Sequence, residues 1–183
     1  MDLAAVAERL RRITVGLANA DHAGGAGVVW TPGLIVTAAH VVRGPRLAVR
    51  LADGRRSHAV VVAREPSTDL ALLRAPEVDL PPAIVAEPGP MRVGALIIAV
   101  GHPLGLRGAV TTGVVHALGP IVPGGRPWIQ ADLRLAPGNS GGPLADARGY
   151  LVGLNAMIAG GLALAIPVSE VRRFVTTAGA QPA

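Results

Sequence analysis

A serine within a glycine-rich loop is the residue of this sequence best suited to nucleophilic chemistry. The stretch from Ala136 to Leu144 reads APGNSGGPL and places Ser140 between an asparagine and a pair of glycines. Pro, Gly, Asn and Ser are common in surface turns, so this composition also fits a turn with no chemical role. The alternative is a nucleophile on a loop whose backbone amides face a reacting oxygen. Turn chemistry alone does not separate the two interpretations.

The order of the other candidate residues along the chain limits the type of site. GNSGG matches the G-x-S-x-G pattern of α/β-hydrolases, in which an acid and then a histidine follow the serine. Here all five histidines precede Ser140, so that arrangement is excluded. The chain has no cysteine, which excludes disulfides and thiolate chemistry. The order that remains for a triad is histidine, then aspartate, then serine.

His40 is the preferred candidate for the general base. It follows the apolar run LIVTAA, which places an imidazole at the end of a strand beside two small residues. The other four histidines have ordinary structural interpretations: a loop for His22, strands for His58 and His116, and a turn for His102, which lies near the serine half.

Asp69 is the preferred candidate for the acid. It lies directly before the apolar run LALLR, and a carboxylate buried there would require a partner because burying an unpaired charge is costly. The alternative for this residue is a cap or turn before the strand. Asp53 precedes a glycine in a hairpin turn, and Asp132 and Asp146 fit strand ends or turns.

Short β-rich runs separated by turn signals must position these residues. About a dozen strands without long intervening helices indicate an antiparallel barrel or sandwich. The ten clearest runs are AGVVW, LIVTA, RLAVRL, HAVVVAR, LALLR, ALIIAV, VTTGVVHA, WIQAD, YLVGLNA and LALAI.

Two short helices are expected at the ends of the chain, and a proline-rich connector in the middle. Leu3, Val6, Leu10 and Ile13 recur at helical spacing, and this helix is expected to dock on the body of the protein. A last helix is predicted over 169–178, with Ser169 as its N-cap and an inward face of Val168, Val171, Phe174 and Val175. The segment 77–91 is interpreted as the connector between two halves.

Charge and composition argue against a nucleic-acid partner and a membrane span. The net charge is +5 and the basic residues are arginines scattered along the chain. Aromatic residues make up 2%, too few for the stacking platforms of single-strand binding. No apolar run reaches the ~18 residues of a membrane span, and no short-spaced histidine pair suggests a metal or other cofactor site.

Three stretches together carry a family resemblance. TAAH around His40, DLALL from Asp69 and GNSGGPL around Ser140 resemble the trypsin-like serine proteases, and Asn139 before the serine is similar to the HtrA (Do-like) branch. Further similarity lies in VGALIIAVGHPLGL, TTGVVHALG and WIQADLRLAPGNSGG, so the resemblance extends from about Ile13 to Val175.

The resemblance implies an all-β fold of two six-stranded antiparallel β-barrels with short N- and C-terminal helices. Residues 1–12 would form the first helix and 13–178 the protease domain, with barrels at about 13–80 and 92–168. His40, Asp69 and Ser140 would be the triad of a serine endopeptidase acting on unfolded or damaged proteins. Gly138, Asn139 and Ser140 would form the oxyanion hole, with the amides of Gly138 and Ser140 as donors. The alternative is a non-catalytic peptide-binding or chaperone-like module on the same fold.

The resemblance also implies a substrate pocket, formed by Arg134, Leu135, Ala136, Asn155, Met157 and Ile158. Arg134 departs from the small residue that HtrA-like chains usually carry six residues before the serine. Pointing inward it would favour acidic substrate side chains, and pointing outward it would leave a small apolar pocket lined by Leu135. The outward orientation is favoured, because burying an unpaired guanidinium is costly.

Assembly and location follow from the start of the chain. Trimers of the family use an aromatic-containing N-terminal segment, and no aromatic residue precedes Trp30 here, so a monomer is favoured over a trimer. The first residues carry Asp2, Glu8 and three arginines where a signal peptide needs an apolar core. The expectation is a cytoplasmic protein, or an extracytoplasmic one if the chain has been trimmed. The partner expected is a polypeptide substrate.

Overall fold

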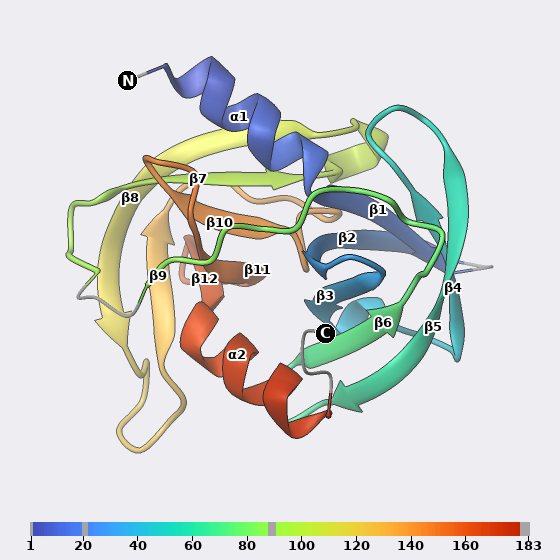
Figure 1. Ribbon diagram of the computed structural model, residues 1–183. Helices are drawn as coiled ribbons and strands as arrows, with labels where there is room; N and C mark the ends of the chain where they lie inside the picture. The colour runs from blue at the N-terminus through green and yellow to red at the C-terminus, as the bar shows by residue number, and fades with distance from the viewer. Residues whose placement is uncertain (1, 20–21, 88–90, 180–183) are drawn as a thin grey trace.

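Two closed antiparallel barrels make up the body of the molecule (Figure 1). The computed structural model describes residues 2–19, 22–87 and 91–179, and within these ranges it contains six strands in each barrel. The first barrel comprises β1 Thr14–Asn19, β2 His22–Thr31, β3 Leu34–Ala38, β4 Arg46–Arg50, β5 Arg56–Glu65 and β6 Leu70–Arg74. The second comprises β7 Leu96–Gly101, β8 Ala109–Gly119, β9 Trp128–Asp132, β10 Pro143–Asp146, β11 Leu151–Ala159 and β12 Leu162–Pro167.

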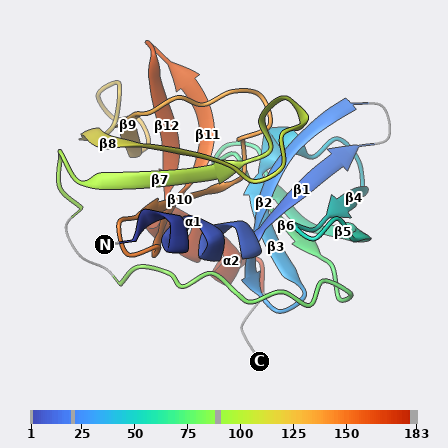
Figure 2. The same ribbon diagram turned by 90° about the horizontal axis from the view of Figure 1, so that it is seen from above.

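The strand order is β1-β2-β3-β6-β5-β4 in the first barrel and β10-β11-β12-β9-β8-β7 in the second. Pairing of β1 with β4 closes the first barrel, and pairing of β10 with β7 closes the second. Figures 1 and 2 show the barrels side by side. The predicted all-β fold is confirmed, and each of the ten predicted runs overlaps a strand. The list of runs lacked β1 and β10, and it placed His22 in a loop, whereas β2 begins at that residue.

Continuous apolar runs in the sequence arise where both faces of a strand are buried. In β6, Ala71 and Leu73 belong to the core inside the first barrel, whereas Leu70 and Leu72 belong to a cluster shared by both barrels and both helices. In β7, Ile97 packs inside the second barrel while the next residue faces that shared cluster. Side chains alternate across a strand, so one strand supplies two cores. The shared cluster fixes the barrels against each other.

The N-terminal helix α1 (Leu3–Arg12) lies across the two barrels. Its first turn is capped by Asp2, whose Oδ1 accepts a hydrogen bond from the amide of Ala5 (3.1 Å). Val6 and Leu10 are buried in the shared cluster, and the helix contacts β1 and β7 (Figure 2). The docking predicted from helical periodicity is confirmed.

The C-terminal helix α2 (Val168–Thr177) contacts β11 and β12 of one barrel and β6 of the other. Its predicted inward face is confirmed, since Val171 and Val175 are buried in the shared cluster. The prediction of Ser169 as N-cap is wrong. Strand β12 pairs through Pro167, and the chain enters the helix at the next residue, so Ser169 already lies in the first turn. Pro167 is the cap, without a side-chain hydrogen bond.

The proline-rich connector follows an extended path along both barrels where it is described. The amide of Ala83 donates to the carbonyl of Val29 (2.8 Å) in the first barrel. The amide of Ala86 donates to the carbonyl of Leu151 (3.0 Å) in the second, and the amide of Leu151 donates to Ile84 (2.8 Å). These bonds satisfy backbone groups that would otherwise lack a hydrogen-bond partner where the connector packs against the barrels.

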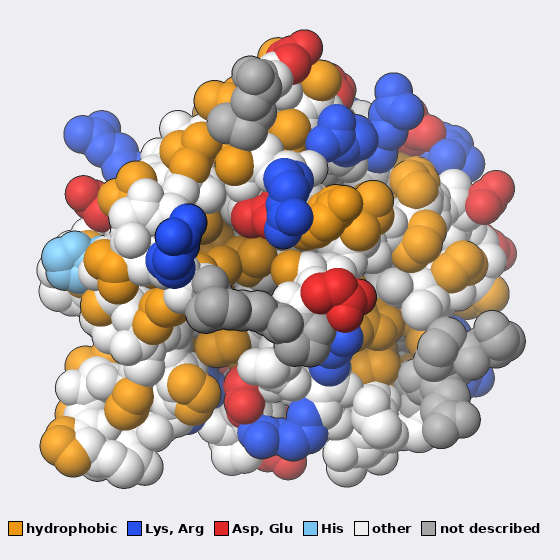
Figure 3. Space-filling model, turned by 60° about the vertical axis from the view of Figure 1, so that its left-hand side comes forward, with side chains coloured by type: hydrophobic (Ala, Val, Ile, Leu, Met, Phe, Trp, Pro, Cys, Tyr) orange, Lys and Arg blue, Asp and Glu red, His pale blue; other side chains and the backbone are white. Residues whose placement is uncertain are grey.

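The outer face of the second barrel carries several exposed apolar side chains. Val110, Val114 and Leu118 alternate along the outside of β8, and Ile121 and Val122 follow in the next turn. Figure 3 shows hydrophobic side chains dispersed among polar and charged groups on this side of the molecule. Neither α1 nor α2, each of ten residues, is long and apolar enough to cross a bilayer, and the described residues include no other α-helix.

Candidate active site

Strand pairing brings His40 and Asp69 together. His40 lies in the 3-10 turn η1 (Ala39–Val41) directly after β3, and Asp69 lies directly before β6. The two strands are antiparallel, with Ala38 opposite Leu70, so the end of β3 meets the start of β6. Nδ1 of His40 lies 2.9 Å from Oδ2 and 3.0 Å from Oδ1 of Asp69. The carboxylate therefore faces one ring nitrogen and leaves the other side of the ring available.

Three hydrogen bonds fix the position of Asp69 beside the imidazole. Its Oδ1 accepts from the backbone amide of His40 (3.0 Å), and its carbonyl accepts from the amide of Ala39 (3.0 Å). Its own amide donates to the carbonyl of Pro66 (3.2 Å). The side chain of Asp69 is 13% exposed, against 48% for His40. The carboxylate is thus largely shielded from water while the imidazole is open to a ligand.

The loop of Ser140 is anchored to both barrels. The carbonyl of Ser140 accepts from the amide of Ala26 in β2 (2.8 Å), and the amide of Gly141 donates to the carbonyl of Asn155 in β11 (2.7 Å). Gly141 has a φ of +82°, and a Cβ there would overlap the carbonyl oxygen of Ala26 and Oγ1 of Thr37. A side chain is therefore excluded immediately after the serine, which explains the glycine in the sequence.

The hydroxyl of Ser140 donates to the carbonyl oxygen of Ala156 (2.9 Å). No hydrogen bond joins it to His40, although both side chains belong to the described part of the chain. The strands thus bring His40 and Asp69 into contact and place the serine loop against β2. A hydrogen bond from the serine to the imidazole requires rotation of the hydroxyl away from Ala156.

Two backbone amides beside the serine are not engaged in hydrogen bonds to the described part of the chain. Within the described residues, the amides of Gly138 and Ser140 have no hydrogen-bond acceptor. The carbonyls on this loop point elsewhere: that of Pro137 accepts from Leu104 (3.2 Å) and that of Gly138 from His102 (3.0 Å). Gly138 has a φ of +106°, and a Cβ there would overlap the carbonyl oxygen of His102. The loop geometry thus leaves two donors available.

Asn139, the third residue predicted for the oxyanion hole, is engaged differently. Its amide donates to the carbonyl of Ala136 (3.0 Å), closing the turn that carries the loop. Its side chain is 6% exposed and lies so close to Gly101 that a Cβ on that glycine would overlap it. Asn139 therefore shapes the loop from inside the protein.

The residues predicted for the substrate pocket occupy different environments. Arg134 is exposed, whereas Leu135 packs against the core of the second barrel and Ala136 is half-buried. Met157 and Ile158 are 43% and 53% exposed at the end of β11. Asn155 is buried, and its Nδ2 donates to the carbonyl of Pro143 (3.0 Å), while its Oδ1 has no hydrogen-bond partner among the described residues.

The family follows from comparison with known proteins. A sequence profile of the family described as Trypsin-like peptidase domain matches residues 25–154. This chain belongs to the trypsin-like peptidase family. Among curated relatives, a probable periplasmic serine endoprotease DegP-like from Pseudomonas putida is 36% identical over 159 residues, covering 82% of this chain and 33% of the relative. The chloroplastic protease Do-like 1 of Arabidopsis thaliana is 38% identical over 186 residues, covering 93% of this chain and 42% of the relative.

Solved structures give the same family. The HtrA-type protease AlgW with decapeptide superposes with a TM-score of 0.88 at 27% identity, covering 97% of this trypsin-like chain and 67% of that one. The resemblance to the HtrA (Do-like) branch is thereby confirmed. The chain spans about a third to two fifths of the length of the curated relatives compared.

Two residues near the trypsin-like site were not assigned a role from the sequence. Arg126 stacks on Trp128, with its guanidinium carbon 3.7 Å from the ring centre, and its Nη1 lies 3.5 Å from the carbonyl of Ser67 in the turn before Asp69. Burial lowers the pKa of Arg126, and the charge of Asp69 partly opposes this. The second residue is Ala156, whose carbonyl accepts the hydrogen bond from Ser140. The sequence gives no signal for it, because any residue type carries a backbone carbonyl.

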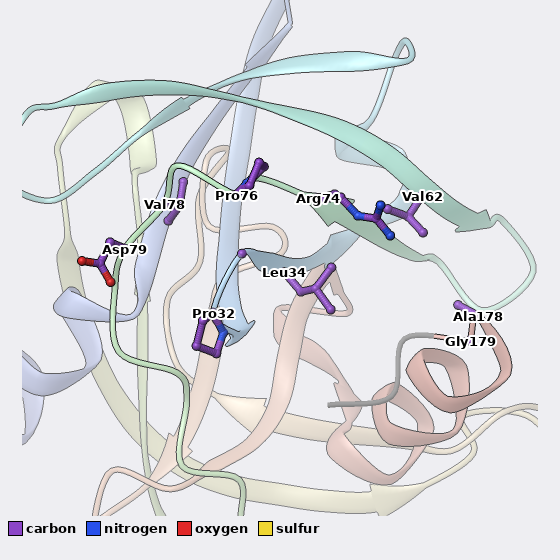
Figure 4. Close-up of a pocket in the computed structure, with 10 residues that line it drawn as sticks. Pro32, Leu34, Val62, Arg74, Pro76, Val78, Asp79, Ala178 and Gly179 are labelled. Atoms are coloured by element: carbon purple, nitrogen blue, oxygen red, sulfur yellow. The ribbon is translucent and has the colours of Figure 1, made fainter. Parts of the chain in front are cut away.

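The cavity in Figure 4 is separate from this site. It has a volume of about 560 Å³ and is lined by Gly33 and Leu34 at the start of β3 and by Arg74 at the end of β6. His40 and Asp69 lie at the opposite ends of these two strands. Figure 4 shows Arg74 and Asp79 on different sides of the cavity, so its charged groups do not converge. Among the described residues, no three His, Cys, Asp or Glu side chains are grouped as for a metal ion.

Proposed function

We propose that this chain is the catalytic domain of a serine endopeptidase that hydrolyses peptide bonds of unfolded polypeptides. The observation that carries the proposal is the contact of Asp69 with His40 beside a serine loop with two unengaged amides. The names of the relatives and the decapeptide named with AlgW support a polypeptide substrate.

His40 activates the serine in this mechanism. The serine hydroxyl rotates from the carbonyl of Ala156 toward the free ring nitrogen of His40, which accepts its proton as Oγ attacks the substrate carbonyl. The carboxylate of Asp69 accepts a hydrogen bond from the Nδ1–H group of His40 and stabilises the imidazolium that forms. The imidazolium then protonates the leaving amine, and water repeats the sequence on the acyl-enzyme.

The amides of Gly138 and Ser140 stabilise the negative oxygen of the tetrahedral intermediate. Donors aimed at that oxygen bind it more strongly than the ground-state carbonyl, and removal of one costs about 3 kcal/mol of transition-state stabilisation. The overlap that a side chain at Gly138 would cause with His102 supports the selection of glycine here.

Labelling with a fluorophosphonate probe tests this function. The parent protein is expected to be labelled at Ser140 and to cleave denatured casein, and Ser140→Ala is expected to lose both while retaining its melting temperature. Labelling of Ser140→Ala, or its cleavage of casein at the parent rate, contradicts the assignment.

A non-catalytic peptide-binding module is the second candidate. It is favoured by one observation, the hydrogen bond from Ser140 to Ala156 in place of one to His40. For that candidate the probe leaves the parent unlabelled although the fold is intact.

Primary specificity is proposed to be for small apolar side chains. The exposure of Arg134 supports its outward orientation, and the half-buried Leu135 and Ala136 then line the pocket. Cleavage-site profiling on a denatured proteome is expected to enrich Val, Ala or Leu before the scissile bond. Enrichment of Asp or Glu at that position contradicts the outward orientation.

Location is proposed from the names of the relatives, and assembly from the N-terminal sequence of this chain. Their names place them in the periplasm and the chloroplast, and we propose an extracytoplasmic location for this chain as well. A monomer remains the preferred state, and sedimentation velocity of the purified protein tests it.

A further inference from the structure

A second cavity lies between the two barrels and adjoins the serine loop. Its volume is about 460 Å³. Residues of β1, β2, β4 and the start of β5 form one wall, and the loop between β7 and β8 forms the other. Pro137 and Gly138 complete the lining, so the cavity reaches the residue whose amide is proposed to bind the oxyanion.

Among the described residues, three arginines and no acidic residue line this cavity. Arg50 ends β4, Arg56 begins β5, and Arg107 lies in the loop before β8. All three are exposed, and none forms an ion pair with any carboxylate of the described residues. The carboxylate in the turn between β4 and β5, Asp53, is already bound to Nε of Arg55 (2.6 Å). Among the described residues, the cavity therefore presents positive charge without a carboxylate paired to it.

The half-buried imidazole of His102 lies on the cavity wall near these charges. The amide of Gly108 donates to Nδ1 of His102 (3.2 Å), so the proton of the neutral ring is on Nε2. This atom is buried near the backbone of Val15 but forms no well-aligned hydrogen bond within the described residues. Burial lowers the pKa of His102 most, the backbone of Val15 opposes this shift, and the charges of Arg50, Arg107 and Arg11 lower the pKa further. The guanidinium groups from the two barrels thus act on the same point of the cavity wall.

The position of the cavity assigns it to one half of a bound peptide. Gly25, which lines it, lies against both the carbonyl of Ser140 and the side chain of Val41, the neighbour of His40. The residues proposed for the primary pocket, such as Leu135 and Met157, do not line it. When the residue before the scissile bond occupies the primary pocket, the residues after that bond extend past Gly25 toward this cavity.

We propose that this cavity binds a carboxylate side chain of the polypeptide substrate, within the first three residues on the leaving-group side of the scissile bond. Arg50, Arg56 and Arg107 would then determine a preference for Asp or Glu there. The proposal rests on the proposed function for the direction of the peptide.

Exposed guanidinium groups set the size of the expected effect. An Arg–carboxylate pair at a solvent-exposed site changes affinity by only a few-fold, and salt weakens it. An arginine beside the cavity can bind a carboxylate through two parallel hydrogen bonds, and three arginines together raise the positive potential inside it. Both effects favour Glu over its amide isostere Gln. A preference that disappears at high salt is therefore the signature of this site.

Binding to the Ser140→Ala protein tests the site without requiring turnover. The probes are fluorescein-labelled heptapeptides with Val before the expected scissile bond and a single Glu at the first, second or third position after it. Each is compared with its Gln counterpart by fluorescence anisotropy. We expect at least one Glu peptide to bind about threefold or more tighter than its Gln partner in about 50 mM salt, and the ratio to approach one in about 0.5 M salt. We also expect NMR titration to show the pKa of His102 rising when that peptide binds, because the carboxylate offsets the nearby positive charge.

Two variants separate this site from general electrostatic attraction. In Arg50→Gln/Arg107→Gln the Glu-to-Gln ratio is expected to fall to about one. Arg46→Gln removes an exposed arginine from the same strand, outside the cavity lining, and is expected to keep the parent ratio. A ratio near one in the parent for all three peptides, or a ratio unchanged in the double variant, overturns the proposal. If the fluorophosphonate probe fails to label the parent while the Glu preference persists, the proposed function fails and the site stands.

Discussion

At the scale of single residues, the site depends on unusual backbone positions that only certain side chains accept. Asp69 has a φ of +55°, a region that Asp and Asn enter more readily than other non-glycine residues. The same residue carries the carboxylate beside His40. The left-handed backbone and the hydrogen-bonded contact with His40 therefore coincide at one position, a combination typical of functional sites.

Asp69→Asn is expected to remove activity and preserve the fold. Asn accepts the same backbone conformation but cannot hold the Nδ1 proton of His40 as a carboxylate does, so kcat is expected to fall about 10⁴-fold. The melting temperature is expected to remain close to that of the parent. Asp69→Ala is the comparison: it should lose activity similarly and also lose about 1 kcal/mol of stability from the left-handed backbone. Casein turnover above a tenth of the parent rate in Asp69→Asn would exclude the proposed role.

His102 is expected to make stability depend on pH. Its pKa is lowered in the folded protein, so the unfolded chain takes up the proton first as the pH falls. The stabilisation from the neutral ring is complete above the unfolded pKa of about 6.5 and is lost progressively below it. His102→Asn retains an acceptor for the amide of Gly108 but has no proton to bind. Between about pH 7.5 and 5.5 the melting temperature is expected to fall less in the variant than in the parent. Parallel curves would show that His102 does not contribute to the pH dependence.

At the scale of elements, two antiparallel strands and two loops assemble the site, and helices stabilise the arrangement. Pairing of β3 with β6 aligns His40 with Asp69, while hydrogen bonds to β2 and β11 anchor the serine loop. Helix α1 contacts β1 of one barrel and β7 of the other. Helix α1 therefore joins the two barrels, and its contribution to the free energy of unfolding depends on the residues that face the shared cluster.

Leu10→Ala is expected to destabilise the protein by about 2–5 kcal/mol, because the side chain is 1% exposed and its removal leaves a cavity. Leu3→Ala is the matched control on the same helix, since Leu3 is 38% exposed, and its effect is expected within about 0.5 kcal/mol. Urea denaturation followed by circular dichroism measures both. Equal effects of the two substitutions would contradict the docking of α1.

At the scale of the whole molecule, the two barrels share one core in addition to their own. Leu70 and Leu72 of the first barrel and Leu154 and Ile166 of the second belong to the same cluster as the inward faces of both helices. Separation of the barrels would expose this cluster to water, at roughly 25 cal/mol per Å² of apolar surface. The site, which draws residues from both barrels, depends on this contact.

Thermal unfolding is expected to proceed in one transition. Because each barrel completes the core of the other, calorimetry should give equal calorimetric and van't Hoff enthalpies. Two resolved transitions, or a first transition that leaves one barrel folded by NMR, would show that the shared cluster does not couple the barrels.

Local features of the sequence were sufficient for much of the fold. Alternating and continuous apolar runs marked ten of the strands of the described chain, and helical periodicity marked the buried face of α1. Strand β10 has only four residues, begins with a proline and contains no such run. In β1, glycine and asparagine interrupt the apolar pattern, so the strand was not predicted. The N-cap of α2 was misassigned because pairing of β12 continues through Pro167, a tertiary effect that no local cap signal records.

The residue types and order of His40, Asp69 and Ser140 were readable from the sequence, because a triad needs particular chemical groups and a glycine-rich loop marks a serine. The contact between His40 and Asp69 was decided only by the tertiary structure, since strand register brings together residues 29 positions apart. The same holds for the hydroxyl of Ser140 bound to a backbone carbonyl and for three arginines from two barrels around one cavity. Sequence patterns record what each residue can do, whereas distance and direction arise from packing between segments that are remote along the chain.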